Sequence, residues 1–139
     1  TYNSTMKKLI IGLLISFGFV NTSLAEIEYY HCEKGIDSYW RFDIDAINNL
    51  SPDSLSKSRR KNAIGEITDL TNVTFSNEWF KVIINAGLIT EVSYISRIGE
   101  ESVRKVTSSI SSSEHDLGFC KNYIRDKDLS SFFKRNSET

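Results

Sequence analysis

The chain has 139 residues, of which 17 are Lys or Arg and 18 are Asp or Glu, so its formal net charge is −1. This balance argues against a nucleic-acid-binding protein, because such proteins usually carry a strong excess of basic residues. The composition is ordinary for a globular protein and argues against wholesale disorder. Residues 26–139 are long enough for one domain with a modest core, and we predict a single β-rich domain there.

The first 25 residues have the pattern of an export signal. A short positive region begins at Met6, an apolar run of 12 residues covers 9–20, and the small residues Ser23 and Ala25 fit a cleavage site. A permanent membrane helix needs about 20 apolar residues, so this run is too short to be one. We therefore predict that residues 1–25 comprise upstream residues plus a cleavable signal peptide. The mature chain is then periplasmic or secreted, without permanent membrane insertion.

Two cysteines, Cys32 and Cys120, lie near the two ends of the predicted domain. An even number of cysteines in an oxidising compartment favours a disulfide over free thiols. We therefore predict one disulfide that closes a loop of nearly the whole domain.

The beginning of the domain predicts a β-hairpin. Residues 26–33 are aromatic and β-branched, residues 34–37 turn the chain at Gly35, and residues 38–45 alternate in character. In the second strand, one predicted face carries Trp40, Phe42 and Ile44, and the other carries Tyr39, Arg41, Asp43 and Asp45.

A polar stretch, residues 46–62, interrupts the strand pattern. Ser51 followed by Pro52 resembles a helix start, so we expect a short helix or ordered loop from Pro52 to about Arg60. This stretch is also the most polar of the domain, and we expect it to be its most mobile part.

Further strands are predicted from residue 64 onward, with turn signals between them. The predicted segments are residues 64–75, 79–85, 88–98, 102–113 and 118–121. Residues 126–135 are expected to make one or two helical turns with Leu129, Phe132 and Phe133 packed onto the sheet, followed by a frayed C-terminal tail. The predicted fold class is all-β: a small antiparallel barrel or sandwich with one short helix or helical loop after the second strand.

Candidate catalytic and metal-binding residues are few. His31 and His115 each lie near a cysteine, but His31 and Cys32 should point to opposite faces of a strand, and no zinc-type spacing is present. His115 with Asp116 lacks a nucleophile motif such as GxSxG. The acidic pairs Asp43 with Asp45 and Glu100 with Glu101 are interpreted as solvated surface groups. We predict no catalytic residue, no metal and no cofactor.

Candidate partner-binding residues form two groups. Arg59, Arg60 and Lys61, with Lys57 nearby, make a basic cluster in the polar stretch, where an anionic partner could bind. Tyr30 and Tyr39 are expected on strand faces away from their apolar neighbours, where an exposed tyrosine is a good interface anchor. No aromatic residues accompany the basic cluster, which argues again against nucleic acid.

The opening Tyr30-His31-Cys32-Glu33-Lys34-Gly35 and the closing Gly118-Phe119-Cys120-Lys121 resemble small exported bacterial β-proteins stapled by a disulfide. Among characterised groups the chain is loosely similar to the MliC-type periplasmic lysozyme inhibitors. That resemblance implies a small β-barrel that inserts a loop into an enzyme cleft. The inhibitory Ser-Gly-x-x-Tyr loop of that family has no counterpart here, so no functional residue is transferred.

The expected function is that of an exported, non-catalytic binding protein with a protein partner in the cell envelope, as an inhibitor or immunity-type protein of an enzyme. The alternative is a carrier that holds a small hydrophobic ligand in a β-barrel. A third class, a hydrolase using His115, is less favoured.

Overall fold

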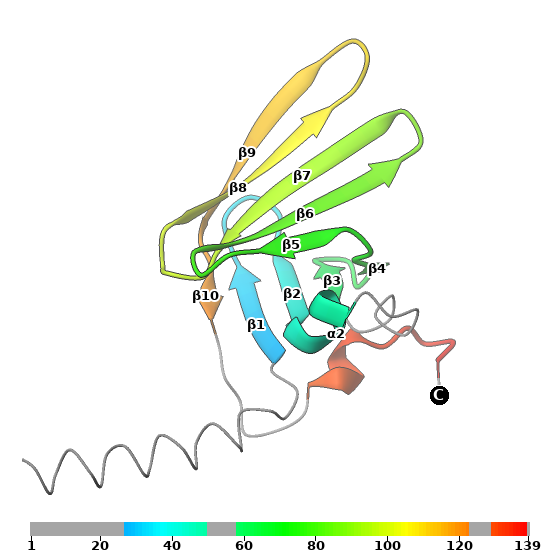
Figure 1. The fold of residues 1–139 in the computed structure, drawn as a ribbon. Coiled ribbons are helices and arrows are strands. Elements are labelled where there is room, and N and C mark those ends of the chain that lie inside the picture. The colour runs from blue at the N-terminus through cyan, green and yellow to red at the C-terminus, as the bar shows by residue number, and fades with distance from the viewer. Residues whose placement is uncertain (1–26, 50–57, 123–128, 139) are drawn as a thin grey trace, which may run out of the picture.

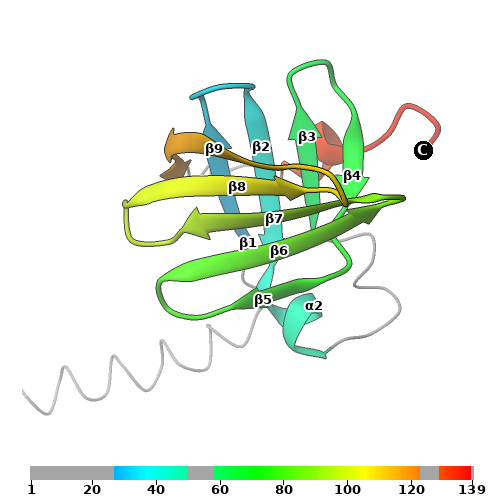
Figure 2. The same cartoon turned by 90° about the horizontal axis from the view of Figure 1, so that it is seen from above.

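The computed structural model describes residues 27–49, 58–122 and 129–138. The described chain is mostly strand, arranged in two antiparallel five-stranded sheets, which confirms the predicted all-β class (Figure 1). Figure 2 shows that the strands of one sheet run across those of the other, in a sandwich-like arrangement. The predicted signal peptide lies outside the described residues. No helix within the described ranges is long and apolar enough to cross a membrane.

The first sheet has the strand order β10-β1-β2-β3-β4. Its strands are β1 (Ile27–Cys32), β2 (Ser38–Asp43), β3 (Arg59–Asn62), β4 (Ile67–Asp69) and β10 (Lys121–Asn122). The second sheet has the order β5-β6-β7-β8-β9. Its strands are β5 (Val73–Phe75), β6 (Trp79–Ala86), β7 (Ile89–Ser96), β8 (Glu101–Thr107) and β9 (Ser112–Phe119). A short helix, α2 (Ile44–Asn49), follows β2, and a 3-10 helix, η2 (Ser130–Phe133), follows the strands.

Aromatic rings fill the space between the two sheets. Phe42 of the first sheet stacks on Phe80 of the second, with ring centroids 3.9 Å apart, and Tyr30 meets both rings edge-on. Trp40 stacks beside Phe42 at 6.0 Å. Trp40 and Phe42 are both in the core, as the alternation of the second strand predicts. Such ring pairs contribute beyond the area they bury, so they are the main non-covalent link between the sheets.

The helix begins earlier than the sequence predicts. The backbone N–H of Ala46 donates to Asp43 Oδ1 at 3.0 Å, so Asp43 caps α2 and the second strand ends at Asp43 instead of Asp45. Residues 52–57 of the predicted helix lie outside the described residues. The prediction is wrong at Arg59 and Arg60, because they belong to β3, which pairs with both β2 and β4. Backbone pairing on two sides makes this a strand, although it contains no apolar residue.

The serine-rich segment is also corrected. Residues 102–113 are predicted as one strand, but β8 ends at Thr107 and β9 begins at Ser112. The Ser108 N–H donates to the Ser111 carbonyl at 2.8 Å, and the Ser108 hydroxyl accepts from the Ser111 N–H. Serine hydroxyls favour turns because they bond nearby backbone groups. Ile110 consequently lies in the turn and is exposed.

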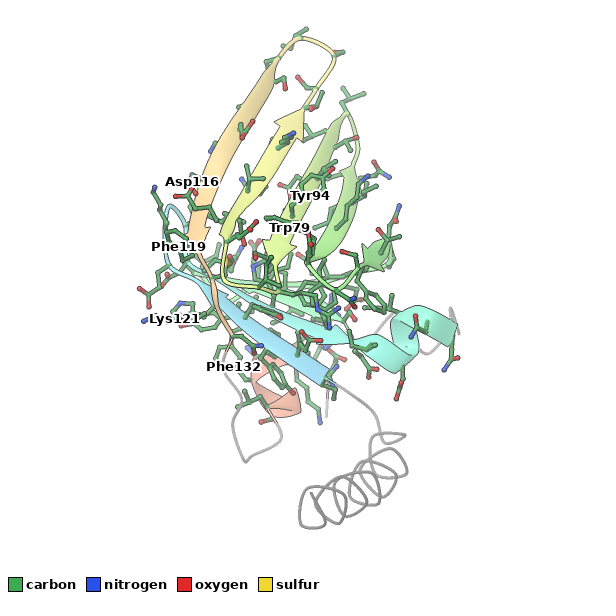
Figure 3. The ribbon with its side chains drawn as sticks, turned by 60° about the vertical axis from the view of Figure 1, so that its left-hand side comes forward. Trp79, Tyr94, Asp116, Phe119, Lys121 and Phe132 are labelled. Carbon is green, nitrogen blue, oxygen red and sulfur yellow. A yellow bond between two sulfur atoms is a disulfide. The ribbon has the colours of Figure 1, made fainter. Side chains whose placement is uncertain are left out.

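The predicted disulfide between Cys32 and Cys120 is confirmed. Cys32 ends β1 of the first sheet, and Cys120 lies between β9 of the second sheet and β10 of the first. Figure 3 shows the chain descending from Asp116 and Phe119 on β9 to Lys121. The bond therefore fixes the point where the chain crosses from one sheet to the other.

The segment around η2 covers the outer face of the first sheet, below it in Figure 3, where Phe132 is labelled. Phe133 is buried and stacks on Tyr29 at 5.9 Å, as the predicted packing of this segment requires, whereas Phe132 is partly exposed. Arg59 donates to the Phe133 carbonyl at 2.8 Å and to both carboxylate oxygens of Glu138 at 2.9 Å. The sequence predicts that this tail frays, yet Glu138 is bound to the sheet through Arg59.

Reduction of the disulfide should lower the free energy of unfolding strongly. The two cysteines are 88 residues apart, and a loop of that length is worth about 4 to 5 kcal/mol in chain entropy. Guanidinium denaturation of the oxidised protein, the reduced protein and the Cys32→Ala/Cys120→Ala double variant measures this difference. Equal free energies for the oxidised and reduced forms would contradict the expectation.

The Arg59–Glu138 contact should make stability depend on pH in the acid range. Hydrogen bonding from Arg59, together with the Arg135 backbone N–H, lowers the pKa of Glu138 from 4.5 to about 2. Because the folded-state pKa is the lower one, the contact stabilises the fold above pH 4.5, and the stabilisation is lost as the pH falls toward 2. We expect Glu138→Gln to lower Tm at pH 7 and to match the parent near pH 2.

The control for that measurement is Glu100→Gln, since Glu100 is an exposed carboxylate in the turn between β7 and β8. Its Tm should follow the parent at every pH. A Glu138→Gln variant that melts like the parent at pH 7 would show that the contact adds nothing to stability.

Candidate binding site

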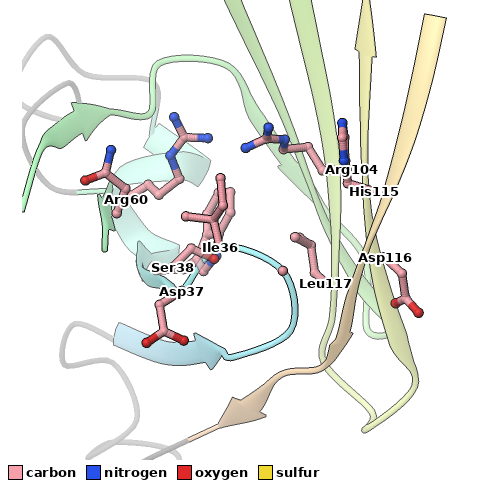
Figure 4. Close-up of a pocket in the computed structure, with 11 residues that line it drawn as sticks. Ile36, Asp37, Ser38, Arg60, Arg104, His115, Asp116 and Leu117 are labelled. Carbon is pink, nitrogen blue, oxygen red and sulfur yellow. The ribbon is translucent and has the colours of Figure 1, made fainter. Parts of the chain in front are cut away.

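A cavity of about 190 Å³ opens between the two sheets, at the end of the sandwich where the β1–β2 turn meets β8 and β9 (Figure 4). It is lined from the first sheet by the turn at Gly35 and by side chains of β2 and β3, and from the second sheet by side chains of β8 and β9. The cavity starts where the aromatic core ends, because Trp40 belongs to both.

The wall of the cavity is partly apolar. Trp40 and Leu117 are buried, and Ile36 stands at the rim on the β1–β2 turn, where it is exposed. The Trp40 indole N–H donates to Ser38 Oγ at 2.9 Å, so the polar edge of the ring is already satisfied within the wall. Trp40 therefore offers the cavity an apolar ring with no open donor.

Two arginines from opposite sheets reach into this space. Figure 4 shows the guanidinium groups of Arg60, on β3, and Arg104, on β8, extending toward one another. Arg60 lies over the Trp40 ring at 5.6 Å and forms a 3.0 Å ion pair with Glu91. The Arg104 Nε atom is buried, and no described residue accepts a hydrogen bond from it. Arg104 thus brings a cationic side chain to a cavity whose wall is partly apolar.

The other charged groups at the cavity are engaged. Lys34 pairs with Asp116 at 2.6 Å, and this hydrogen bond, with one from the Gly118 N–H, lowers the pKa of Asp116. Asp37 lies 3.5 Å from His31 Nε2. His115 is the cross-strand neighbour of Arg104 and contacts Ser113 Oγ at 3.2 Å. The carboxylates therefore lie at the rim or in ion pairs, and Glu91 offsets the charge of Arg60.

The predicted basic cluster is divided by the strand that contains it. Successive residues of a strand point to opposite faces, so Arg60 faces the cavity whereas Arg59 and Lys61 face the η2 segment. Arg59 is buried between Asp69, at 2.9 Å, and Glu138. The Lys61 ammonium lies 3.9 Å from the Phe132 ring centroid. Only Arg60 of the three joins the cavity, and Lys57 lies outside the described residues.

The prediction for Tyr30 is wrong, because Tyr30 is only 1% exposed and lies in the core. Burial, and then the 2.6 Å hydrogen bond that its hydroxyl donates to Glu28, raise the pKa of Tyr30. Tyr30 lies on the face of β1 that packs against the second sheet, where its ring meets Phe80. Tyr39 stacks on His31 at 4.1 Å and is half-buried on the outer face, away from the cavity.

The two histidines are separated by the fold. His31 stacks on the outer face beside Glu33, whereas His115 lines the cavity. Among the residues that the structure describes, no group of three or more His, Cys, Asp or Glu side chains could hold a metal ion. Asp116 is bound to Lys34 rather than to its neighbour His115.

Arg104 was missed as a site residue, although the sequence carries a signal for it. The strand alternation that places Val106 on an inward face places Arg104 on the same face. An arginine in the core-facing register of a strand needs a partner or a cavity, so that register was the informative feature.

Comparison of the chain with protein-family models, with curated proteins and with solved structures gives no match.

Proposed function

We propose that this is a non-catalytic binding protein whose cavity takes a compact ligand with an apolar body and one carboxylate. The observation that carries the proposal is the convergence of Arg60 and Arg104, from opposite sheets, beside the ring of Trp40. A guanidinium group binds a carboxylate through parallel hydrogen bonds. A ligand carboxylate in the cavity would meet the guanidinium group of Arg104, which lines the wall.

The volume of the cavity limits the size of the ligand. An apolar cavity of about 150 Å³ holds benzene, whereas drug-sized pockets measure about 300 Å³ or more. At about 190 Å³, the cavity suits one ring or a short branched chain with its carboxylate beside Arg60 and Arg104. This changes the carrier hypothesis from a purely hydrophobic ligand, for which two arginines would be unfavourable neighbours, to an organic acid.

The same chemistry can come from two sources. One is a free organic acid, and the other is an acidic side chain beside an apolar one on a protein partner in the cell envelope. The second source retains the expected role as an inhibitor or immunity-type protein. The disulfide supports an exported location for either source, with the periplasm as the proposed compartment.

A non-catalytic role is supported by the surroundings of His115. Within the described ranges, its contact with Ser113 is the one feature near the cavity that resembles a nucleophile with its base, and Ser113 is exposed on the same strand. A working pair needs a third group that orients the imidazole, and none of the ion pairs in the described chain involves His115.

Ligand binding should depend on Arg104 and on the carboxylate. We expect phenylacetate to shift the Trp40 indole N–H resonance in a titration and phenylacetamide, its neutral analogue, to leave it unchanged. Arg104→Met should weaken phenylacetate binding by about ten- to a hundredfold, the range expected for hydrogen bonds to a charged group. Lys105→Met is the matched control, because Lys105 is the next residue of β8 and points to the other face.

A second arm separates the two ligand sources. A blocked peptide with one aspartate between two leucines is titrated under the same conditions. Tighter binding of the peptide than of phenylacetate points to a protein partner, and the reverse points to a free acid. Equal binding of the acid and its amide, or equal loss in Arg104→Met and Lys105→Met, would overturn the proposal.

A further inference from the structure

Two hairpin tips of the second sheet lie together at one end of the molecule. The β6–β7 hairpin turns at Gly87 and Leu88, and the β8–β9 hairpin turns at residues 108–111. Thr90 of β7 pairs with Thr107 of β8, so the two turns are neighbours beyond the last paired residues of those strands. Figure 1 shows both hairpins projecting away from the first sheet and α2.

Each tip presents a large aliphatic side chain to solvent. Leu88 is 89% exposed and Ile110 is 92% exposed, and Ile89 beside Leu88 is 42% exposed. A single exposed aliphatic residue is ordinary on a protein surface. Here two nearly bare aliphatic side chains stand on the tips of neighbouring hairpins, and exposed apolar groups gathered at one end of a molecule mark contacts with membranes or other proteins.

The tips are also free of charge. Residues 85–90 and 106–113 contain no Lys, Arg, His, Asp or Glu. Apart from the aliphatic residues, these segments consist of small or neutral polar residues, mainly Ser and Thr. The nearest charged residues along the strands are Glu91, Lys105 and Glu114. Moving the tips into an apolar medium therefore removes no ionised group from water, which would be the largest cost of that transfer.

We propose that Leu88 and Ile110 form a membrane-contact surface that dips into the interface of a lipid bilayer. The aliphatic ends enter the boundary of the acyl chains, and the serine and threonine hydroxyls meet the ester oxygens of the headgroups. A bilayer fits these tips because their aliphatic ends are flanked by uncharged residues, so they can enter the acyl-chain boundary without burying a charge. The surface lies apart from the cavity residues, so this inference does not rest on the proposed ligand.

The contact should be weak, reversible and independent of lipid charge. Burying one aliphatic side chain is worth about 1.5 to 3 kcal/mol, or about one to two orders of magnitude in partitioning. Two such residues should therefore bind a membrane only marginally, as a single acyl chain attached to a protein does. Because the tips are uncharged, salt and anionic lipid should have little effect.

The test uses the full chain with vesicles of phosphatidylcholine, alone or with phosphatidylglycerol. Leu88→Trp and Ile110→Trp variants place a fluorophore at each tip, and brominated lipids report its depth by quenching. The control is Ile64→Trp, because Ile64 is 80% exposed on the β3–β4 turn, outside the two tips. We expect quenching at positions 88 and 110, none at position 64, and the same result at low and high salt.

Partitioning gives the second readout. Leu88→Ser and Ile110→Ser should each reduce vesicle binding by about tenfold or more, whereas Ile64→Ser should not change it. Depth quenching reports the position of each tip directly. It therefore tests the proposal even if another part of the chain also binds the vesicle. Quenching no greater at positions 88 and 110 than at position 64, or binding that requires anionic lipid, would overturn the inference.

Discussion

The disulfide between Cys32 and Cys120 is the constraint on which the rest of the structure depends. It closes at the crossing from β9 to β10 and holds the end of β1 there. The β1–β2 turn follows Cys32 directly, and the Lys34–Asp116 ion pair and the close approach of Gly118 to Lys34 keep that turn against β9. The same turn is one wall of the cavity. The covalent bond therefore sets the width of the candidate site as well as the stability of the domain.

The two sheets are held most tightly at the aromatic core and separate beyond it. Phe42 and Phe80 stack where the sheets cross, and Arg60 and Arg104 occupy the positions beyond the last ring. Aromatic rings occupy the inward-facing positions at the core, and arginines occupy the inward-facing positions beyond them. The space between the sheets is therefore packed at the core and becomes, beyond it, a cavity that is apolar on one side and charged on the other. Such amphipathic cavities favour ligands that are themselves two-sided.

Much of the fold could be predicted from the sequence, because strand alternation and cysteine pairing are local or countable signals. Trp40 and Phe42 share a face as their spacing indicates, and Cys32 and Cys120 are bonded. The failures have a common cause, which is dependence on distant partners. Arg59 and Arg60 form a strand only because β2 and β4 lie on either side. Tyr30 is buried because Phe80, from the other sheet and distant in sequence, packs against its ring. The cavity is likewise invisible in sequence, because its two arginines come from different sheets.

The pairing of β1 with β10 affects how the domain forms. The strand at the start of the domain finds its edge partner, and its disulfide, only in a segment 88 residues downstream. Contacts so distant in sequence slow folding, since a long loop must close before they form. A ribosome or an export channel delivers the chain in order. The rings of Tyr30 and Trp40 would therefore remain exposed until the later strands are available. Such a sequence depends on being shielded until its later segments arrive, and acquires its native shape only after delivery is nearly complete.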